Sequence, residues 1–150
     1  MKLYTSRYAN RELMNPDVTV VAISRGLPKY ETAYKIAGRI WDIAPARELY
    51  GASHFEFRRA YLRQLEVAGF QRIRRALAEY RDCGTVVLCC FEDVRNPEDW
   101  CHRRMFAEWW ERHTGQKIEE YPDPSTPKSQ KNIKPPVEVE EPAFEQMRFF

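Results

Sequence analysis

Apolar positions along the chain fall into two kinds of pattern, which predict strands and helices in alternation. Residues 18–24 (VTVVAIS) and 85–90 (TVVLCC) are continuous apolar runs, typical of strands buried on both faces of a parallel sheet. The opening MKLYTS favours a short first strand, and KIEEY at residues 117–121 favours a short last one.

Between these runs the apolar residues recur at helical spacing. One helix is predicted from Phe55 to Ala68 and a second from Phe70 to Tyr80, with Gly69 separating them. A third helix is predicted after TVVLCC, ending near Thr114, whereas residues 30–54 fit neither period. Strands separated by helices predict a single-domain α/β layered sandwich with a mainly parallel sheet and helices on both faces.

Composition changes after Tyr121. Six prolines stand among charged and small residues in 122–150, which opposes regular structure and predicts an irregular, Pro-rich extended tail after an α/β domain at 1–121. The end of the tail, PAFEQMRFF, is apolar enough to dock on its own domain, the commoner outcome, or on a partner.

Charge and cysteine content bear on partners and location. The formal net charge is only +2, but residues 47–82 hold eight arginines against five acidic residues. Such helices usually present a solvated face, and a surface for nucleic acid is the alternative. No apolar stretch approaches the roughly 20 residues of a membrane span, and the N-terminus lacks a signal-peptide block, so no membrane partner and a cytoplasmic location are expected. Four cysteines are then expected to be reduced thiols.

Two loops at the carboxyl ends of predicted strands carry candidate binding residues. Ligands of α/β sheets bind at this edge. One loop carries Arg25 and Lys29, and the other leads into the helix that contains Arg103. Because a guanidinium matches oxyanions, these residues are candidates for binding a phosphate- or nucleotide-like anion.

Cys101 is a candidate nucleophile, on a condition set by the start of the helix. If the helix begins at Pro97, after Asn96 as the N-cap, then Cys101 lies a full turn inside and gains little from the helix dipole. If residues 96–99 form a separate turn and the helix begins near Trp100, the thiol gains the activating position. The sequence leaves both cases open.

His102 and Glu92 each have two interpretations. Helical spacing places His102 on the apolar face, where a structural role is commoner than acid–base catalysis. Glu92 directly follows a buried strand, where it is either a general base or an ion-pair partner for Arg103. A zinc site from Cys90, Glu92, Cys101 and His102 is disfavoured by the irregular spacing, so neither a metal nor another cofactor is expected.

The motifs VVLCCFE and WCHRRMFAEWW together resemble the signature of the domain-of-unknown-function family numbered four-eight-eight, found in bacteria and phages. The resemblance covers most of residues 1–121. It implies an α/β fold and a shared site formed by Cys90, Glu92, Cys101, His102 and Arg103. It also matches VAISRGLPK at Arg25 and FEFRRAYLRQL at Tyr61, which makes Tyr61 and Cys90 supporting residues. The family's name supplies no reaction.

Three hypotheses follow for the function. The first is a small enzyme or pseudo-enzyme that binds a phosphate- or nucleotide-like anion, with catalysis by the Cys101 thiol or by Glu92. The second is a non-catalytic module that binds nucleic acid or protein through the arginine-rich helices. The third gives the Cys-His-Arg triplet a structural role, in which Arg103 and Glu92 form a buried pair. Whether the chain is an enzyme, and its oligomeric state, stay open at this stage.

Overall fold

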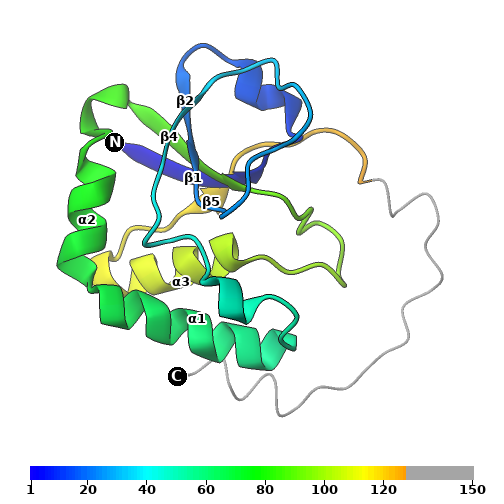
Figure 1. The fold of residues 1–150 in the computed structure, drawn as a ribbon. Coiled ribbons are helices and arrows are strands. Elements are labelled where there is room, and N and C mark those ends of the chain that lie inside the picture. The colour runs from blue at the N-terminus through cyan, green and yellow to red at the C-terminus, as the bar shows by residue number, and fades with distance from the viewer. Residues whose placement is uncertain (128–150) are drawn as a thin grey trace.

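A five-stranded, entirely parallel sheet forms the centre of the protein in a computed structural model that describes residues 1–127 (Figure 1). The strand order is β3-β2-β4-β1-β5, with β4 between β2 and β1. Val87 at the middle of β4 is in register with Val20 on one side and Tyr4 on the other. The strands are β1 (Lys2–Arg7), β2 (Val18–Ala22), β3 (Ile36–Arg39), β4 (Thr85–Cys90) and β5 (Glu119–Glu120).

One face of the sheet is covered by three α-helices, which supply ten of the eighteen buried residues in the larger core cluster. Ser53 caps the first of them by accepting a hydrogen bond from the backbone N–H of Glu56. Gly69, at a φ of 91°, separates the first two helices as expected, because an L side chain is strained in that conformation. These helices are α1 (His54–Ala68), α2 (Phe70–Ala78) and α3 (His102–Thr114).

The opposite face carries no α-helix within residues 1–127. The short 3₁₀ helix η1 (Arg11–Met14) buries Leu13 there against Val20, Val87 and Cys89. Two further 3₁₀ helices, η2 (Arg47–Leu49) and η3 (Arg81–Cys83), lie in connections. The predicted single-domain α/β fold with a parallel sheet is confirmed, although its two faces are covered unequally.

Strand β3 is the element that the sequence pattern did not predict. It has only four residues and lies at the edge of the sheet, and Gly38 in its centre has the hydroxyl of Tyr80 directly over its Cα. A side chain at this position would collide with that ring. The glycine therefore permits a close approach and, at the same time, breaks the hydrophobic pattern.

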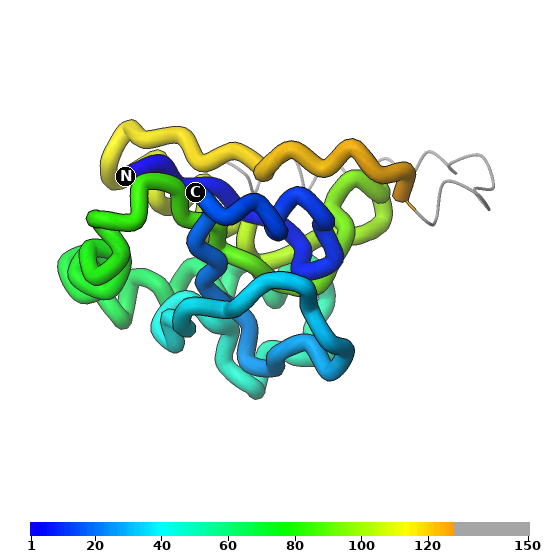
Figure 2. The backbone as a smooth tube through the Cα atoms, turned by 90° about the horizontal axis from the view of Figure 1, so that it is seen from above, coloured from blue at the N-terminus to red at the C-terminus, as the bar shows by residue number. Residues whose placement is uncertain are grey.

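The chain returns to its first strand after α3. β5 pairs with β1, and the segment that follows runs along the same edge of the molecule, in yellow to orange beside the blue first strand in Figure 2. Asp123 accepts a hydrogen bond from Arg7 at 2.7 Å, and Asn10 donates to the carbonyl of Pro122. The expected docking segment PAFEQMRFF lies outside the described residues. Within residues 1–127, no helix has the length and apolar character needed to cross a membrane.

Candidate functional site

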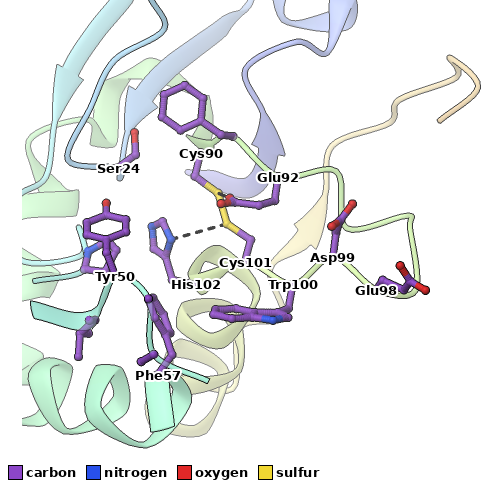
Figure 3. Close-up of a pocket in the computed structure, with 15 residues that line it drawn as sticks. Ser24, Tyr50, Phe57, Cys90, Glu92, Glu98, Asp99, Trp100, Cys101 and His102 are labelled. Atoms are coloured by element: carbon purple, nitrogen blue, oxygen red, sulfur yellow. Dashed lines mark hydrogen bonds between the residues drawn. A yellow bond between two sulfur atoms is a disulfide. The ribbon is translucent and has the colours of Figure 1, made fainter. Parts of the chain in front are cut away.

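A cavity of about 330 Å³ opens at the carboxyl ends of β2 and β4, where the sequence predicts a ligand edge (Figure 3). The start of α3 and the loops before α1 complete its wall. We call this cavity the cysteine pocket. It is lined by Ser24, Pro45, Leu49, Tyr50, Gly51, Ala52, Phe57, Cys90, Phe91, Glu92, Glu98, Asp99, Trp100, Cys101 and His102.

The start of α3 settles the position of Cys101. Residues 96–99 form a separate turn, in which the backbone N–H of Asp99 donates to the carbonyl of Asn96 and the Asn96 amide donates to the Asp99 carboxylate. Helix α3 begins at His102, with Cys101 as its N-cap residue and no side chain capping the helix. Of the two predicted cases, the second is therefore the one that occurs.

Cys90 and Cys101 are joined by a disulfide, so the expectation that all four cysteines are reduced is wrong for this pair. They are 11 residues apart, but β4 ends at Cys90 and α3 begins after Cys101, which brings the two side chains together at one wall of the pocket. Cys83 and Cys89 are free thiols. Cys89 is buried on the opposite face of the sheet, as strand geometry predicts for neighbours, and burial raises the pKa of its thiol.

His102 is buried between the sheet and the pocket. Its Nε2 lies 2.5 Å from the carbonyl oxygen of Ile23, and a carbonyl can only accept, so Nε2 carries the proton. Burial lowers the pKa of His102 to about 4, and the ring is therefore neutral near pH 7. The unprotonated Nδ1 then faces Cys101 Sγ at 3.6 Å.

Arg103 is almost fully buried and its guanidinium is occupied by partners within the chain. Nε and NH2 donate to the carboxylate of Glu120, with the shortest of these contacts at 2.8 Å, and NH1 donates to the Glu92 carbonyl at 2.7 Å. NH1 also lies 3.1 Å from Cys90 Sγ. The predicted pairing of Arg103 with the Glu92 carboxylate is wrong, because the carboxylate that binds Arg103 comes from β5.

The remaining predicted residues are placed as follows. The Glu92 side chain is exposed at the pocket, with Oε2 3.6 Å from Cys90 Sγ. Arg25 lies over the ring of Trp41, 5.7 Å from its centre, and Lys29 is exposed. Neither Arg25 nor Lys29 is among the residues that line the cysteine pocket.

Tyr61, the expected supporting residue, lies beneath the site. It is fully buried, donates from its hydroxyl to the carbonyl of Ile43 at 2.6 Å and meets the edge of the His102 ring. Through these contacts it fixes both the loop before α1 and the orientation of the imidazole.

Several lining residues were not predicted. Phe57 and Trp100 pack against each other with their rings tilted by 59° and form an apolar wall. Ser24 accepts a hydrogen bond from Tyr8, whose pKa burial raises to about 12. The position of Trp100 directly before Cys101 was the available signal for that wall. The contact between Tyr8 and Ser24 joins two strand ends and has no local sequence signal.

A second group of polar side chains lies beside the pocket, towards β1 and β5. Arg95 donates to both oxygens of Asp93, and Arg7 and Arg95 both lie within ion-pair distance of Asp123. We call this group, which carries three positive and three negative charges, the arginine cluster. It consists of Arg7, Asp93, Arg95, Arg103, Glu120 and Asp123.

Three possible metal-ligand atoms gather in the wall of the pocket. Cys90 Sγ, Cys101 Sγ and a ring nitrogen of His102 all lie within 4.8 Å of one another, and all three residues are buried. The irregular spacing that disfavoured a zinc site in the sequence does not keep the donors apart, because the contact of Nε2 with the Ile23 carbonyl turns Nδ1 of His102 towards the Cys101 sulfur.

A family model described as "Domain of unknown function DUF488" matches residues 7–110. The matched region includes β2, β4, the cysteine pocket and most of α3, and ends before Glu120. No curated protein and no solved structure shows significant similarity to the chain.

Proposed function

The chain belongs to the DUF488 family, whose description names no activity, and we propose from the geometry of the site that it performs thiol-based chemistry on a small molecule in the cysteine pocket. In this proposal Cys101 is the attacking thiol and Cys90 is the resolving thiol. The observation that carries the proposal is that both sulfur atoms lie in one wall of the pocket, within bonding distance of each other.

The surroundings of Cys101 support its role as the attacking group. A thiol at an uncapped helix N-terminus gains from the helix dipole, which stabilises its thiolate. The bare Nδ1 of His102 faces the same sulfur and can accept the thiol hydrogen bond in the reduced protein. In this proposal His102 orients the thiol, which corresponds to the structural interpretation of this residue and not to acid–base catalysis.

The proposed reaction is thiol–disulfide exchange. The Cys101 thiolate attacks one sulfur of a small disulfide substrate and displaces the other half as a thiolate. The Cys90 thiolate then attacks Cys101 Sγ, forms the Cys90–Cys101 bond and releases the second half. The two cysteines are thereby oxidised by two electrons, and the substrate disulfide is reduced by the same two electrons and leaves as two thiolates, which take up protons from solvent. Arg103 NH1 supports the second step, because it can stabilise the Cys90 thiolate.

Cysteine variants test this order of events. When Cys90→Ser is treated with glutathione disulfide, a mixed disulfide between Cys101 and one glutathione should accumulate as the other glutathione leaves as a thiolate, as measured by intact mass and peptide mapping. With Cys101→Ser it should not form, and Cys83→Ser, which changes an exposed free thiol, serves as the control. Adduct formation at Cys90 in Cys101→Ser at the same rate would overturn the assignment. An alkylation pKa at Cys101 no lower than the ordinary ~8.5 would do the same.

The anionic character of the ligand remains a separate part of the proposal. The uncapped start of α3 favours a phosphate or carboxylate next to Cys101. The rim, however, carries Glu92, Glu98 and Asp99, and the lining contains no lysine or arginine within residues 1–127. Inorganic phosphate and a nucleoside monophosphate should slow alkylation of Cys101 if the anion binds there. Unchanged alkylation at millimolar concentrations of both would remove the anion from the proposal.

Binding of nucleic acid is a second candidate function, favoured by one observation. The outward faces of α1 and α2 expose Arg59, Arg63, Arg72, Arg74 and Arg75, of which Arg72 pairs with Asp42. Retention of the protein on a labelled oligonucleotide should fall steeply with salt and should be weakened by Arg63→Glu and Arg74→Glu together. Absence of binding at low salt would exclude this function.

A further inference from the structure

We propose that the reduced protein binds one zinc ion through Cys90 Sγ, Cys101 Sγ and His102 Nδ1, with a fourth coordination position open to the cysteine pocket. This inference goes beyond the thiol chemistry proposed above. It requires only that the two cysteines be reduced, and not that either be a catalytic nucleophile.

The three donor atoms already converge on one point. They come from the end of β4 and the start of α3 and lie within 4.8 Å of one another, with all three residues buried. Two thiolates and one imidazole form a donor set that prefers zinc to magnesium or calcium, whose ligands are oxygens. The same donor set with an open fourth position is typical of catalytic zinc sites.

Contacts behind the donors fix their orientation. The Nε2–H of His102 donates to the Ile23 carbonyl, which leaves Nδ1 as the nitrogen with a free lone pair. Metal-bound histidines usually have their second nitrogen anchored in this way. On the other side, Arg103 NH1 lies 3.1 Å from Cys90 Sγ, where its positive charge offsets part of the charge of two thiolates.

The backbone also leaves room for an ion between the sulfur atoms. The Cα atoms of Cys90 and Cys101 are 7.6 Å apart, whereas disulfides usually span about 4.4–6.8 Å. Two cysteines that share a zinc ion hold their sulfur atoms further apart than a disulfide does, because each Zn–S bond is about 2.3 Å long.

The conversion from disulfide to metal site balances in two steps. A dithiol reductant gives two electrons and two protons to the Cys90–Cys101 bond and becomes a disulfide itself, leaving two thiols in the protein. Zinc then replaces the two thiol protons, which pass to solvent, and its oxidation state does not change. The disulfide and the metal-bound form are thus alternative states of the same two sulfur atoms.

The open position faces the cavity. The pocket wall around the donors includes Trp100, Phe57 and the exposed carboxylate of Glu92, whose Oε2 is 3.6 Å from Cys90 Sγ. We assign the fourth position to water or a pocket ligand, with Glu92 beside it as a group that can accept a proton from that water.

The test uses the full chain, reduced with a phosphine under anaerobic conditions and titrated with zinc against a chromophoric chelator. One zinc ion per chain is expected. Cobalt substitution should give thiolate-to-cobalt charge-transfer bands and the strong visible bands of a tetrahedral site. X-ray absorption at the zinc edge should show two sulfur neighbours at about 2.3 Å and nitrogen or oxygen at about 2.0–2.1 Å.

Matched variants distinguish this site from adventitious binding. Cys90→Ser and Cys101→Ser should each weaken zinc binding by more than the roughly 10–100-fold that loss of a second-shell partner costs. Cys89→Ser and Cys83→Ser should leave it unchanged, because both thiols lie away from the site. Glu92→Gln should weaken affinity by no more than that roughly 10–100-fold, because Glu92 does not hold the ion itself, and a loss as large as that of the cysteine variants would contradict an open fourth position.

Two results would overturn the proposal. One is an absence of zinc binding to the reduced wild-type chain, and the other is unchanged binding in Cys101→Ser. If His102→Gln fails to fold, the nitrogen neighbour in the absorption spectrum of the wild type still tests that ligand. A low alkylation pKa at Cys101 without zinc binding would leave the thiol chemistry standing, and zinc binding with ordinary thiol reactivity would leave only the metal site.

Discussion

The cysteine pocket and the arginine cluster lie side by side at the carboxyl edge of one sheet, yet their polar groups are satisfied in different ways. In the cluster, three guanidinium groups and three carboxylates pair with one another. In the pocket, three carboxylates face a cavity without a lysine or arginine in its described lining, and two sulfur atoms and a bare imidazole nitrogen share one wall.

This difference separates two neighbours in the sequence. Arg103 belongs to the cluster and uses its donors to tie β5 and the loop after β4 to the start of α3. Cys101 and His102 belong to the pocket and point their sulfur and nitrogen atoms towards each other. The side chains that could bind or react with a ligand therefore lie on the pocket side, whereas those of the cluster bind one another. Substitutions on the two sides should have different effects.

The largest effect is expected for Arg103→Met. The change leaves the Glu92 carbonyl without this donor and breaks the pair with Glu120, so the free energy of unfolding should fall by about 3 kcal/mol in urea titrations. Arg59→Met, at an exposed position on α1, should change it by less than about 0.5 kcal/mol. If the Arg103→Met protein were stable but had lost ligand or metal binding, Arg103 would contribute to binding and not to stability.

A smaller effect is expected for Tyr61→Phe, which removes one hydrogen bond beneath the pocket. The Ile43 carbonyl loses its buried donor, which should cost about 1–2 kcal/mol in the same titrations. Tyr50→Phe is the matched control, because Tyr50 lines the pocket but is exposed. Equal effects of the two changes would show that the buried hydrogen bond of Tyr61 adds nothing to the free energy of unfolding.

Asp93→Asn should have a still smaller effect on stability, less than about 1 kcal/mol, because its pairs with Arg7 and Arg95 are partly exposed. The loss should diminish in high salt, which screens such pairs. Thermal unfolding at two salt concentrations measures both parts. A loss as large as that of Arg103→Met would show that the cluster acts as one unit.

The cluster should also make stability depend on pH in a defined range. Hydrogen bonds from Arg95 lower the pKa of Asp93 below its ordinary value. The folded state therefore holds the proton less tightly than the unfolded state. The stabilisation is fully present above the ordinary aspartate pKa of about 4 and is lost as pH falls further. Unfolding curves between about pH 5 and pH 2.5 should show this loss, and Asp93→Asn should reduce it.

Much of the fold follows from local sequence patterns, as α1 and β4 illustrate. The apolar spacing from Phe55, the Gly69 break and the continuous run TVVLCC all predict the elements that form. Strand β3 was not predicted because its hydrophobic pattern is broken by Gly38, which is needed for the approach of Tyr80. That requirement comes from tertiary packing, which a local pattern does not contain.

The site was only partly predictable, because some of its contacts also depend on tertiary packing. The motif that contains Cys90, Cys101 and His102 drew attention to the right junction, and the pocket lies there. The partner of Arg103 was missed because Glu120 is 17 residues away on a strand of two residues. The start of α3 depended on whether the turn 96–99 closes on itself, and the side chain of Asn96 bonds to Asp99 within that turn.

The pairing of β1 with β5 has a consequence for synthesis on the ribosome. Of the strands within residues 1–127, β1 is made first, but its outer neighbour is complete only once Glu120 has been added. At about 5–20 residues per second, this takes on the order of 6–24 s. During that time one side of the first strand lacks its hydrogen-bonding neighbour, and such an edge can pair with another chain. The nascent protein therefore exposes this edge of β1 until β5 has been made.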